Sequence, residues 1–144
     1  MSGLSLPRPA GRVQVEVEIP FHDCDPLGVA WHGRYLEYME ASRRRLFEAH
    51  GLGVLDLIEL GLRMFVSDAR CRYHAPLRYG DSCLVSSWFT PAAPLVRVAY
   101  LIENTTSGRI AARASTVLAL TDETGKLHSE LPVTVRDRLP DLPI

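Results

Sequence analysis

The sequence has almost no lysine, little net charge and few cysteines. Lys126 is the single lysine among 16 basic residues, which against 17 acidic ones give a formal net charge of -1. Nucleic-acid and anionic-membrane surfaces need a concentrated excess of basic residues, so we expect neither partner. The three cysteines, Cys24, Cys71 and Cys83, have no paired short spacing, which argues against a disulfide framework and a zinc knuckle.

Long apolar runs are also absent. No stretch approaches the ~20 apolar residues of a membrane span, and MSGLSLPRPAG at 1–11 lacks the apolar core of a signal peptide. We therefore expect a soluble, cytoplasmic protein without an integral membrane segment. A length of 144 residues, 47% of them apolar, predicts one domain with its own core. We place it at 12–138, between a mobile N-terminal tail at 1–11 and a C-terminal tail at 139–144.

The stretch from Phe21 to Gly51 predicts a short acidic loop that leads into the longest helix of the chain. Apolar residues recur there at the spacing of one helical face; they are Leu36, Met39, Leu46 and Phe47. Gly51 supplies a stop, because glycine enters the left-handed conformation after a helix at no steric cost.

Strands are predicted around this helix. Four apolar residues between Val13 and Ile19 alternate with polar ones, which is typical of a half-buried strand. A short second helix ends at Gly61, and four consecutive strands then follow, with a short helix near the C-terminus; the strands are expected at 63–73, 82–90, 95–104 and 109–122. The fold class is α+β, an antiparallel sheet of about five strands wrapped around one long central helix. Open sheet edges favour pairing with a second copy, so we expect at least a homodimer.

Ionisable and backbone-permissive residues converge where the long helix begins, namely Asp23, Asp25, Pro26, Gly28 and His32. A helix start exposes unpaired N–H groups and a partial positive charge. A carboxylate beside free amide donors can attack a carbonyl while the donors hold the oxygen that becomes negative. These residues by themselves leave open whether Asp25 is catalytic or a turn acid.

A pattern of seven positions over 21 residues runs through this region, Asp-x-Asp-x-x-Gly-x-x-x-His-x-x-Tyr-x-x-x-x-Glu-x-x-Arg, carried by Asp23, Asp25, Gly28, His32, Tyr35, Glu40 and Arg43. It resembles the hot-dog-fold acyl-CoA thioesterases of the 4-hydroxybenzoyl-CoA thioesterase type. It also resembles the related envelope-associated (Tol-Pal cluster) short acyl-CoA thioesterases. Tyr73-His74-Ala75-Pro76 and Gly80-Asp81 stand where the family has a strand end and a turn.

The resemblance implies a hot-dog fold whose protomers pair their sheets edge to edge, with active sites at the dimer interface and a homotetramer as a common assembly. It implies hydrolysis of an acyl-CoA or acyl-carrier-protein thioester. By position in the motif, Asp25 would be the nucleophile or general base, and the backbone N–H of His32 the oxyanion donor. The residues expected to bind substrate are Gly28, Trp31, Gly33 and Tyr35; no cofactor and no metal are expected.

One departure concerns recognition of the coenzyme phosphates. Aromatic-type members of the family carry a basic cluster in the turn between the third and fourth strands, where this chain has Pro91-Ala92-Ala93-Pro94. Phosphates would then be bound elsewhere, or the acyl group would arrive on a carrier protein. The candidate phosphate ligands are Arg63, Arg70, Arg72 and Arg78.

Other motif residues have structural interpretations. We expect Asp23 to hydrogen-bond to the loop backbone, Glu40 and Arg43 to form an ion pair on one helix face, and Cys24 to be a poor nucleophile between two carboxylates. Four residues are candidates for the lining of an acyl pocket, and the sequence does not show which of them line it. They are Leu57, Met64, Phe65 and Trp88.

Two other functions stay open. The fold also suits a hydratase or dehydratase acting on an acyl thioester, and it suits an acyl-binding module without turnover. Release of a free thiol separates a thioesterase from both.

Overall fold

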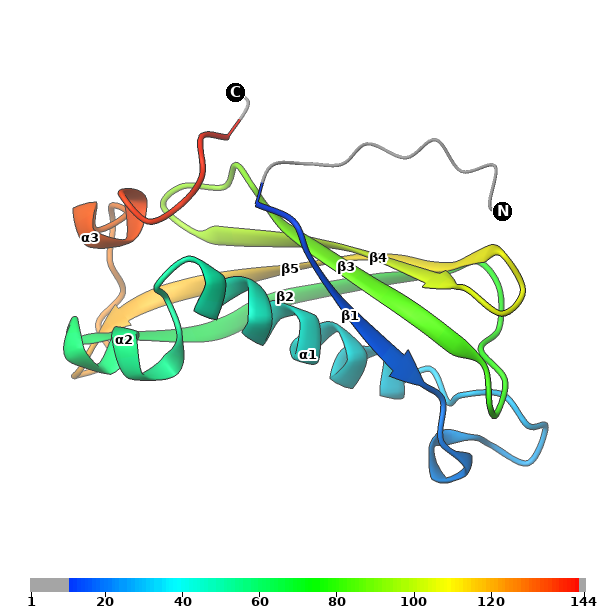
Figure 1. Ribbon diagram of the computed structural model, residues 1–144. Coiled ribbons are helices and arrows are strands. Elements are labelled where there is room, and N and C mark those ends of the chain that lie inside the picture. The colour runs from blue at the N-terminus through cyan, green and yellow to red at the C-terminus, as the bar shows by residue number, and fades with distance from the viewer. Residues whose placement is uncertain (1–10, 143–144) are drawn as a thin grey trace.

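The computed structural model describes residues 11–142 (Figure 1). Its elements, in chain order, are β1 (Val13–Glu18), the 3₁₀ turn η1 (Phe21–Asp23), α1 (Arg34–Ala49), α2 (Val54–Glu59), β2 (Leu62–Tyr73), β3 (Ser82–Thr90), β4 (Val96–Asn104), β5 (Arg109–Asp122) and α3 (Val133–Arg136). The predicted strands, the long helix and both short helices are therefore confirmed. The tail predicted at 1–11 lies outside the described residues except for Gly11, as do 143–144 of the predicted C-terminal tail.

The five strands form one antiparallel sheet in the order β1-β3-β4-β5-β2. Consecutive strands β3, β4 and β5 are neighbours because short turns join them. The chain enters the sheet at β1, crosses one face as α1, and returns as β2 on the opposite edge. In the described chain, β1 and β2 each pair on one side only, so both edges of the sheet are free.

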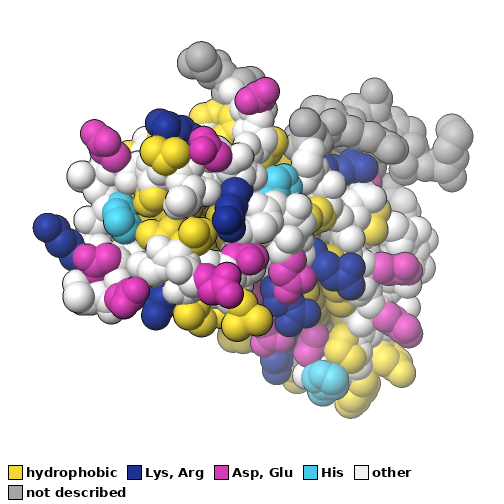
Figure 2. Space-filling view, turned by 60° about the vertical axis from the view of Figure 1, so that its left-hand side comes forward, with side chains coloured by type: hydrophobic (Ala, Val, Ile, Leu, Met, Phe, Trp, Pro, Cys, Tyr) yellow, Lys and Arg dark blue, Asp and Glu magenta, His cyan; other side chains and the backbone are white. Residues whose placement is uncertain are grey.

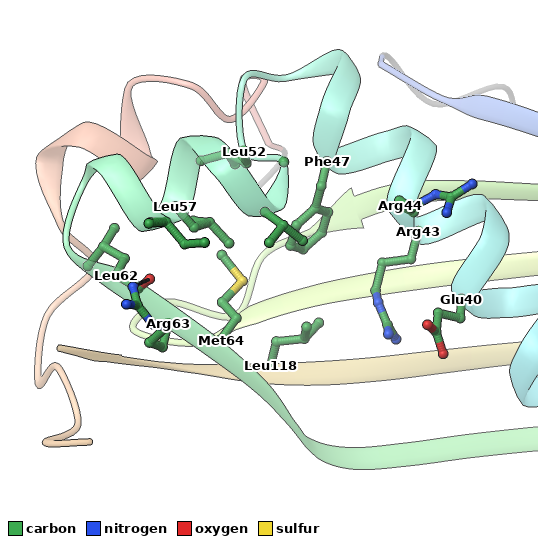
Figure 3. Close-up of a pocket in the computed structure, with 13 residues that line it drawn as sticks. Glu40, Arg43, Arg44, Phe47, Leu52, Leu57, Leu62, Arg63, Met64 and Leu118 are labelled. Carbon is green, nitrogen blue, oxygen red and sulfur yellow. Dashed lines mark hydrogen bonds between the residues drawn. The ribbon is translucent and has the colours of Figure 1, made fainter. Parts of the chain in front are cut away.

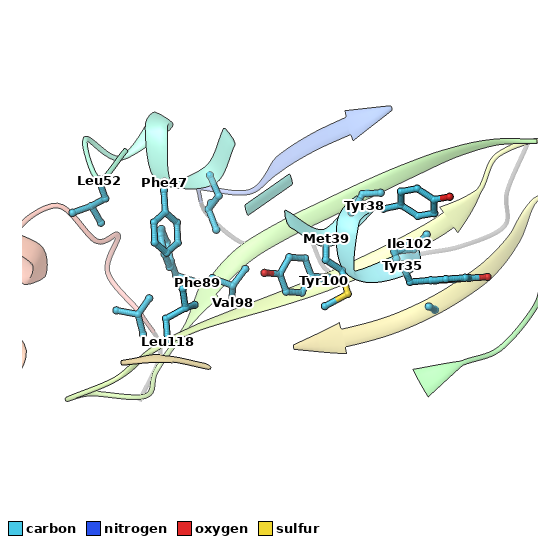
Figure 4. Packing of buried hydrophobic residues seen from close by; sticks show 14 of the residues in the cluster. Tyr35, Tyr38, Met39, Phe47, Leu52, Phe89, Val98, Tyr100, Ile102 and Leu118 are labelled. Atoms are coloured by element: carbon cyan, nitrogen blue, oxygen red, sulfur yellow. The ribbon is translucent and has the colours of Figure 1, made fainter. Parts of the chain in front are cut away.

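The long helix α1 lies along one face of the sheet, which curves around it (Figure 1). Its buried side chains recur at the helical period; they are Tyr35, Tyr38, Met39, Ser42, Leu46 and Phe47. Inward-facing residues of β3 and β4 pack beneath; Val98 and Ile102 of β4 are fully buried (Figure 4), as is Val85 of β3. The hydroxyl of Ser42 donates to the carbonyl of Val85 at 3.1 Å, so the buried polar group is satisfied.

Leu36 corrects one expectation. It was placed on the buried helical face, yet it is 48% exposed. The buried stripe runs instead through Tyr35 and Tyr38, because α1 packs against β1 and β3 and turns Leu36 away from them.

Gly51 is confirmed as a stop of the helix, with φ of 67° and its N–H donating to the carbonyl of Glu48 at 3.3 Å. Among the helices of residues 11–142, none is long and apolar enough to cross a membrane.

The packing of α1 predicts a large cost for a cavity at Leu46, which has no exposed surface. We expect Leu46→Ala to lower the free energy of unfolding by about 2–5 kcal/mol, since the sheet beneath cannot collapse into the space. Leu55→Ala on α2 is the matched control, because Leu55 is 78% exposed and its truncation should cost under about 0.5 kcal/mol. Urea unfolding followed by circular dichroism checks both; equal midpoints would contradict the packing described.

Candidate active site

The acidic loop folds back as a small hairpin ahead of α1. Cys24 and Ala30 form an antiparallel bridge, and the N–H of Asp25 donates to the carbonyl of Val29 at 2.9 Å. Gly28 turns the tip with φ of 80°, a conformation that side-chain-bearing residues rarely adopt. The N–H of Trp31 donates to the carbonyl of Asp23 at 2.9 Å, so the hairpin joins the acidic loop to the residues that begin the helix.

The segment after β2 supports this hairpin from the other side. The N–H of Ala30 donates to the carbonyl of Leu77 at 2.7 Å, and that of Tyr79 donates to the carbonyl of Gly28 at 3.3 Å. Asp81 fixes the segment in turn, since its Oδ2 accepts from the N–H of Arg78 at 2.9 Å and from Asn104 Nδ2 at 2.8 Å. The segment from Leu77 to Asp81, which includes the Gly80-Asp81 turn, therefore holds the acidic loop in place.

Asp25 lies half-buried in this hairpin. Its Oδ1 accepts hydrogen bonds from the N–H of Leu27 at 2.9 Å and of Val29 at 3.3 Å. Its Oδ2 has no hydrogen-bond partner within residues 11–142. One carboxylate oxygen therefore holds the loop and orients the group, while the other is available for chemistry.

The start of α1 offers free amide donors. The N–H groups of Arg34 and Tyr35 bond to the carbonyls of Trp31 and His32, at 2.9 and 3.3 Å. The N–H groups of His32 and Gly33 donate to no group of the described chain. Two unpaired N–H groups at the positive end of a 16-residue helix form a place where negative charge is stabilised.

Aromatic side chains build the wall beside this helix start. The hydroxyl of Tyr73, from the end of β2, donates to the carbonyl of His32 at 3.0 Å. Its ring meets Tyr35 edge-on with centroids 4.8 Å apart, and Tyr35 is only 3% exposed. Burial raises the pKa of Tyr73 to about 12, so it stays a neutral donor at neutral pH. The imidazole of His32 is exposed and lies 4.9 Å from the indole of Trp31.

The position of the Trp31 indole explains why residue 33 is a glycine. A Cβ atom at Gly33 would lie 2.2 Å from the indole, so only glycine lets Trp31 fold over the helix start. The structure thus brings the predicted residues Asp25, Gly28, Trp31, His32 and Gly33 into one region, with Tyr35 behind them. Tyr73 was missed, because a tyrosine at a strand end has no local signature of a contact across 41 residues.

Asp23 is structural, with partners that differ from those expected. Its carboxylate is buried and accepts from the hydroxyl of Tyr38 at 2.6 Å, rather than from loop N–H groups. Arg34 and His22 lie at 3.6 and 3.5 Å from its other oxygen. Burial, followed by the bond to Asp23, raises the pKa of Tyr38 well above its ordinary value. This pair ties the loop to α1.

Cys24 is a poor nucleophile, as expected. Burial raises the pKa of its thiol, and the carboxylates of Asp23 and Asp25 raise it further. The carboxylates are therefore the secondary cause, whereas the sequence suggested them as the main one. Residues 11–142 contain no cluster of His, Cys, Asp and Glu side chains arranged to hold a metal ion.

A cavity of about 320 Å³ lies beside the second half of α1 (Figure 3). Its apolar walls come from α1, α2, β2 and β5 and include Phe47, Leu52, Leu57, Met64 and Leu118. Of the four residues considered for an acyl pocket, Leu57 and Met64 line this cavity, whereas Phe65 and Trp88 do not. Figure 2 shows hydrophobic side chains gathered among charged ones at the α2 end of the molecule, where Val54 and Ile58 are exposed.

Glu40 and Arg43 stand at the charged end of this cavity (Figure 3). They were expected to form an ion pair, but no salt bridge joins them in the described chain. Arg43 instead lies near Tyr100, whose pKa is raised by burial and partly lowered by Thr116 and this guanidinium. The prediction was wrong because both side chains extend toward the sheet and not along the helix surface.

Comparison with known proteins identifies the family. The model of the thioesterase-like superfamily matches residues 19–139, which include the acidic loop, the helix start and all of β2 to β5. The chain belongs to this superfamily. Its fold is the hot-dog fold that the motif suggested, with five antiparallel strands and one long helix.

Solved structures of other thioesterase-like proteins share this fold. A 1,4-dihydroxy-2-naphthoyl-CoA thioesterase from Synechocystis is 22% identical, with a TM-score of 0.78 over 90% of this chain and 96% of that one. A DHNA-CoA thioesterase from Staphylococcus aureus is 25% identical, with a TM-score of 0.77 over 88% and 85%. An Asp-to-Asn variant of 4-hydroxybenzoyl-CoA thioesterase, complexed with 4-hydroxybenzoyl-CoA, is 19% identical, with a TM-score of 0.80 over 91% and 100%.

Among curated sequences, the provisionally assigned acyl-CoA thioesterase YneP of Bacillus subtilis is 32% identical over 73 residues. The match covers 51% of this chain and 53% of YneP, so the chain spans about half the length of the curated relatives it matches.

The buried contact between Tyr38 and Asp23 predicts a stability effect. We expect Tyr38→Phe to lower the free energy of unfolding by about 1–3 kcal/mol, because Asp23 would lose a buried donor. Tyr79→Phe is the matched control, since Tyr79 is 62% exposed. Thermal or urea unfolding measures both; a Tyr38 variant as stable as the Tyr79 variant would show that the bond contributes nothing.

Proposed function

We propose that this protein hydrolyses an acyl-CoA thioester to a carboxylic acid and free coenzyme A. The observation that carries the proposal is the arrangement at the start of α1. There the hairpin that carries Asp25 leads directly into the helix start; within residues 11–142, one oxygen of the Asp25 carboxylate and the N–H groups of His32 and Gly33 have no hydrogen-bond partner. Membership of the thioesterase-like superfamily and acyl-CoA thioesterases among its relatives support the same activity.

The helix start would act on the thioester carbonyl. As the carbonyl carbon is attacked, its oxygen gains negative charge, and the N–H groups of His32 and Gly33 would donate to it. Aligned peptide dipoles of α1 add to this stabilisation, which is larger in a site shielded from water. The bond from Tyr73 to the carbonyl of His32 keeps this peptide in place.

Asp25 would supply the attacking group by one of two routes. As a nucleophile, its free oxygen bonds to the carbonyl carbon, the C–S bond breaks, and water then hydrolyses the acyl-enzyme anhydride. As a general base, it takes a proton from the water that attacks. In both routes the sulfur leaves with the electron pair of the C–S bond and takes up a proton, and the acyl group leaves as a carboxylic acid.

We further propose that two copies complete each active site. The free edge strand β2 carries exposed apolar side chains, since Phe65 is 50% and Val66 42% exposed. Free strand edges pair readily, and a two-fold axis through the middle of β2 would pair the strand with its own copy. A homotetramer of two such dimers and a cytoplasmic location stay predictions.

This pairing would also determine where the acyl group binds. Arg43 lies roughly 16 Å along the helix axis from His32, at 1.5 Å per residue, so the cavity is remote from Asp25 of the same chain. An antiparallel pairing of two β2 strands sets the Tyr73 end of one against the Leu62 end of the other. The cavity of one copy would then lie beside the helix start of the other and receive the acyl group.

Removing the charge of Asp25 tests the function. We expect Asp25→Asn to lower kcat by about 100- to 10,000-fold, because the amide oxygen can keep the bonds from Leu27 and Val29 but cannot act as base or nucleophile. Thiol release from a panel of acyl-CoA substrates, followed with a disulfide reagent, measures the effect.

The exposed Asp137 supplies the control, as Asp137→Asn. Near-normal turnover by a folded Asp25 variant would refute the assignment of Asp25. Absence of thiol release by the unaltered protein, from acyl-CoA and acyl-carrier-protein alike, would favour the hydratase, the dehydratase or the binding module.

Filling the cavity tests the acyl site. We expect Met64→Trp to lower kcat/KM for long-chain acyl-CoA by about ten-fold or more while leaving short chains nearly unchanged, because the indole would occupy the space of the distal carbons. Leu55→Trp, on the exposed side of α2 and outside the cavity lining, is the control. A chain-length profile identical in the two variants would place the acyl group elsewhere.

A further inference from the structure

Three arginines gather on the outer face of the sheet near the end of β2. Arg72 lies directly opposite Arg113 of β5, and Arg70 lies opposite Ser115. Side chains alternate along a strand, and the intervening Cys71 packs against the core under α1, so the arginines emerge on the face away from the helix. They line a surface hollow of about 430 Å³ together with Ser115.

The facing of Arg72 and Arg113 is electrostatically unfavourable for the fold. Like charges directly opposite each other on paired strands are destabilising. Arg70 is paired, with its Nε 3.1 Å from Asp68 Oδ2. Within residues 11–142, the guanidinium groups of Arg72 and Arg113 have no ion pair and no hydrogen bond. Two facing arginines without an acidic partner point to an anion that binds between them.

The hollow lies behind the candidate active site. Arg72 directly precedes Tyr73, whose hydroxyl holds the carbonyl of His32 at 3.0 Å. The same end of β2 thus presents Tyr73 to the helix start on one face and Arg72 to the hollow on the other. A pairing of β2 edges between two copies would use backbone groups and leave the outer face open.

We propose that Arg72 and Arg113, assisted by Arg70, bind the phosphate groups at the nucleotide end of coenzyme A. This inference rests on the proposed function and names the part of its substrate that the hollow receives. The planar guanidinium fork matches phosphate oxygens, often with two hydrogen bonds. Coenzyme A carries its phosphates and its thioester at opposite ends of a long flexible arm, as the separation of hollow and helix start requires.

The other candidate arginines are less suitable. Arg63 lies at the opposite end of β2, and its Nη1 donates to the carbonyl of Leu62 at 2.8 Å. Arg78 lies in the turn held by Asp81. Near the turn between β3 and β4, the nearest arginine, Arg97, donates to the carbonyl of Pro91 at 3.2 Å. None of these three has a second arginine across the strand.

A small ligand fits this surface better than an acidic protein. Asp68 is paired with Arg70, and Glu103 of β4 shares the outer face with Leu84, its register partner. The unpaired positive charge is thus confined to Arg72 and Arg113 in the hollow, which suits a phosphate group better than the broad acidic surface of a carrier protein. We therefore assign the hollow to coenzyme A phosphates.

The test compares two double variants that each remove two positive charges. Arg72→Gln with Arg113→Gln removes the facing pair, and Arg45→Gln with Arg109→Gln removes two exposed arginines elsewhere. Acyl-CoA is compared with the matching acyl-N-acetylcysteamine thioester, which lacks phosphates. Titration calorimetry with adenosine 3′,5′-bisphosphate measures nucleotide binding without any thioester.

We expect the first double variant to raise KM for acyl-CoA by ~10- to 100-fold with little change in kcat, and to weaken nucleotide binding to the same degree. KM for the N-acetylcysteamine thioester should stay the same. The variant should be at least as stable as the unaltered protein, because a repulsion is removed. The second double variant should behave like the unaltered protein.

Three results would overturn the inference: unchanged nucleotide binding in the first variant, an equal rise of KM for both thioesters, or a defect confined to acyl-carrier-protein substrates. Failure of the proposed function has a different signature. If the unaltered protein released no thiol from any thioester yet bound the nucleotide in an arginine-dependent way, hydrolysis would be refuted and the phosphate site would stand.

Discussion

Burial of α1 against one face of the curved sheet is the constraint on which the rest of the structure depends. The stripe from Tyr35 to Phe47 is covered by β1, β3 and β4, and removing this apolar surface from water is the main source of stability in such a domain. A helix held along its whole length has a fixed first turn. The free N–H groups of His32 and Gly33 therefore occupy one position relative to the sheet, which is what preorganised stabilisation of a negative oxygen needs.

Asp23 and Asp25, with only Cys24 between them, have different surroundings. Asp23 faces inward, where the hydroxyl of Tyr38 and the nearby Arg34 compensate its burial. Asp25 sits in the hairpin of the loop, where backbone N–H groups engage only one of its oxygens. Asp23 thus anchors the loop to α1, and the anchored loop orients Asp25. One oxygen of the Asp25 carboxylate holds the loop, which leaves the other without a hydrogen-bond partner in residues 11–142.

Several features around β2 have no partner within the described residues of a single chain. One edge of this strand is free, apolar residues beside it are exposed, and a cavity opens toward its Leu62 end. The outer face near its Tyr73 end carries facing arginines. A paired second copy and a phosphate-bearing thioester would account for these features together, since the first covers the edge and the second neutralises the arginines. The strand would thereby connect the parts of the proposed substrate site.

The sequence by itself determined the order and type of the elements. Alternation from Val13 to Ile19, the period of α1 and the glycine at position 51 are local signals, set by side-chain direction and backbone freedom within a few residues. The motif around Asp25 was also readable, because its residues lie on one continuous loop and helix start. Tertiary structure alone decided which helical face is buried, and it turned Leu36 outward. It also separated Glu40 from Arg43 and paired Asp23 with Tyr38. The contact of Tyr73 with His32 and the facing of Arg72 by Arg113 depend on strand register over about forty residues of chain. Register follows from the packing of the whole sheet, so no local pattern could reveal them.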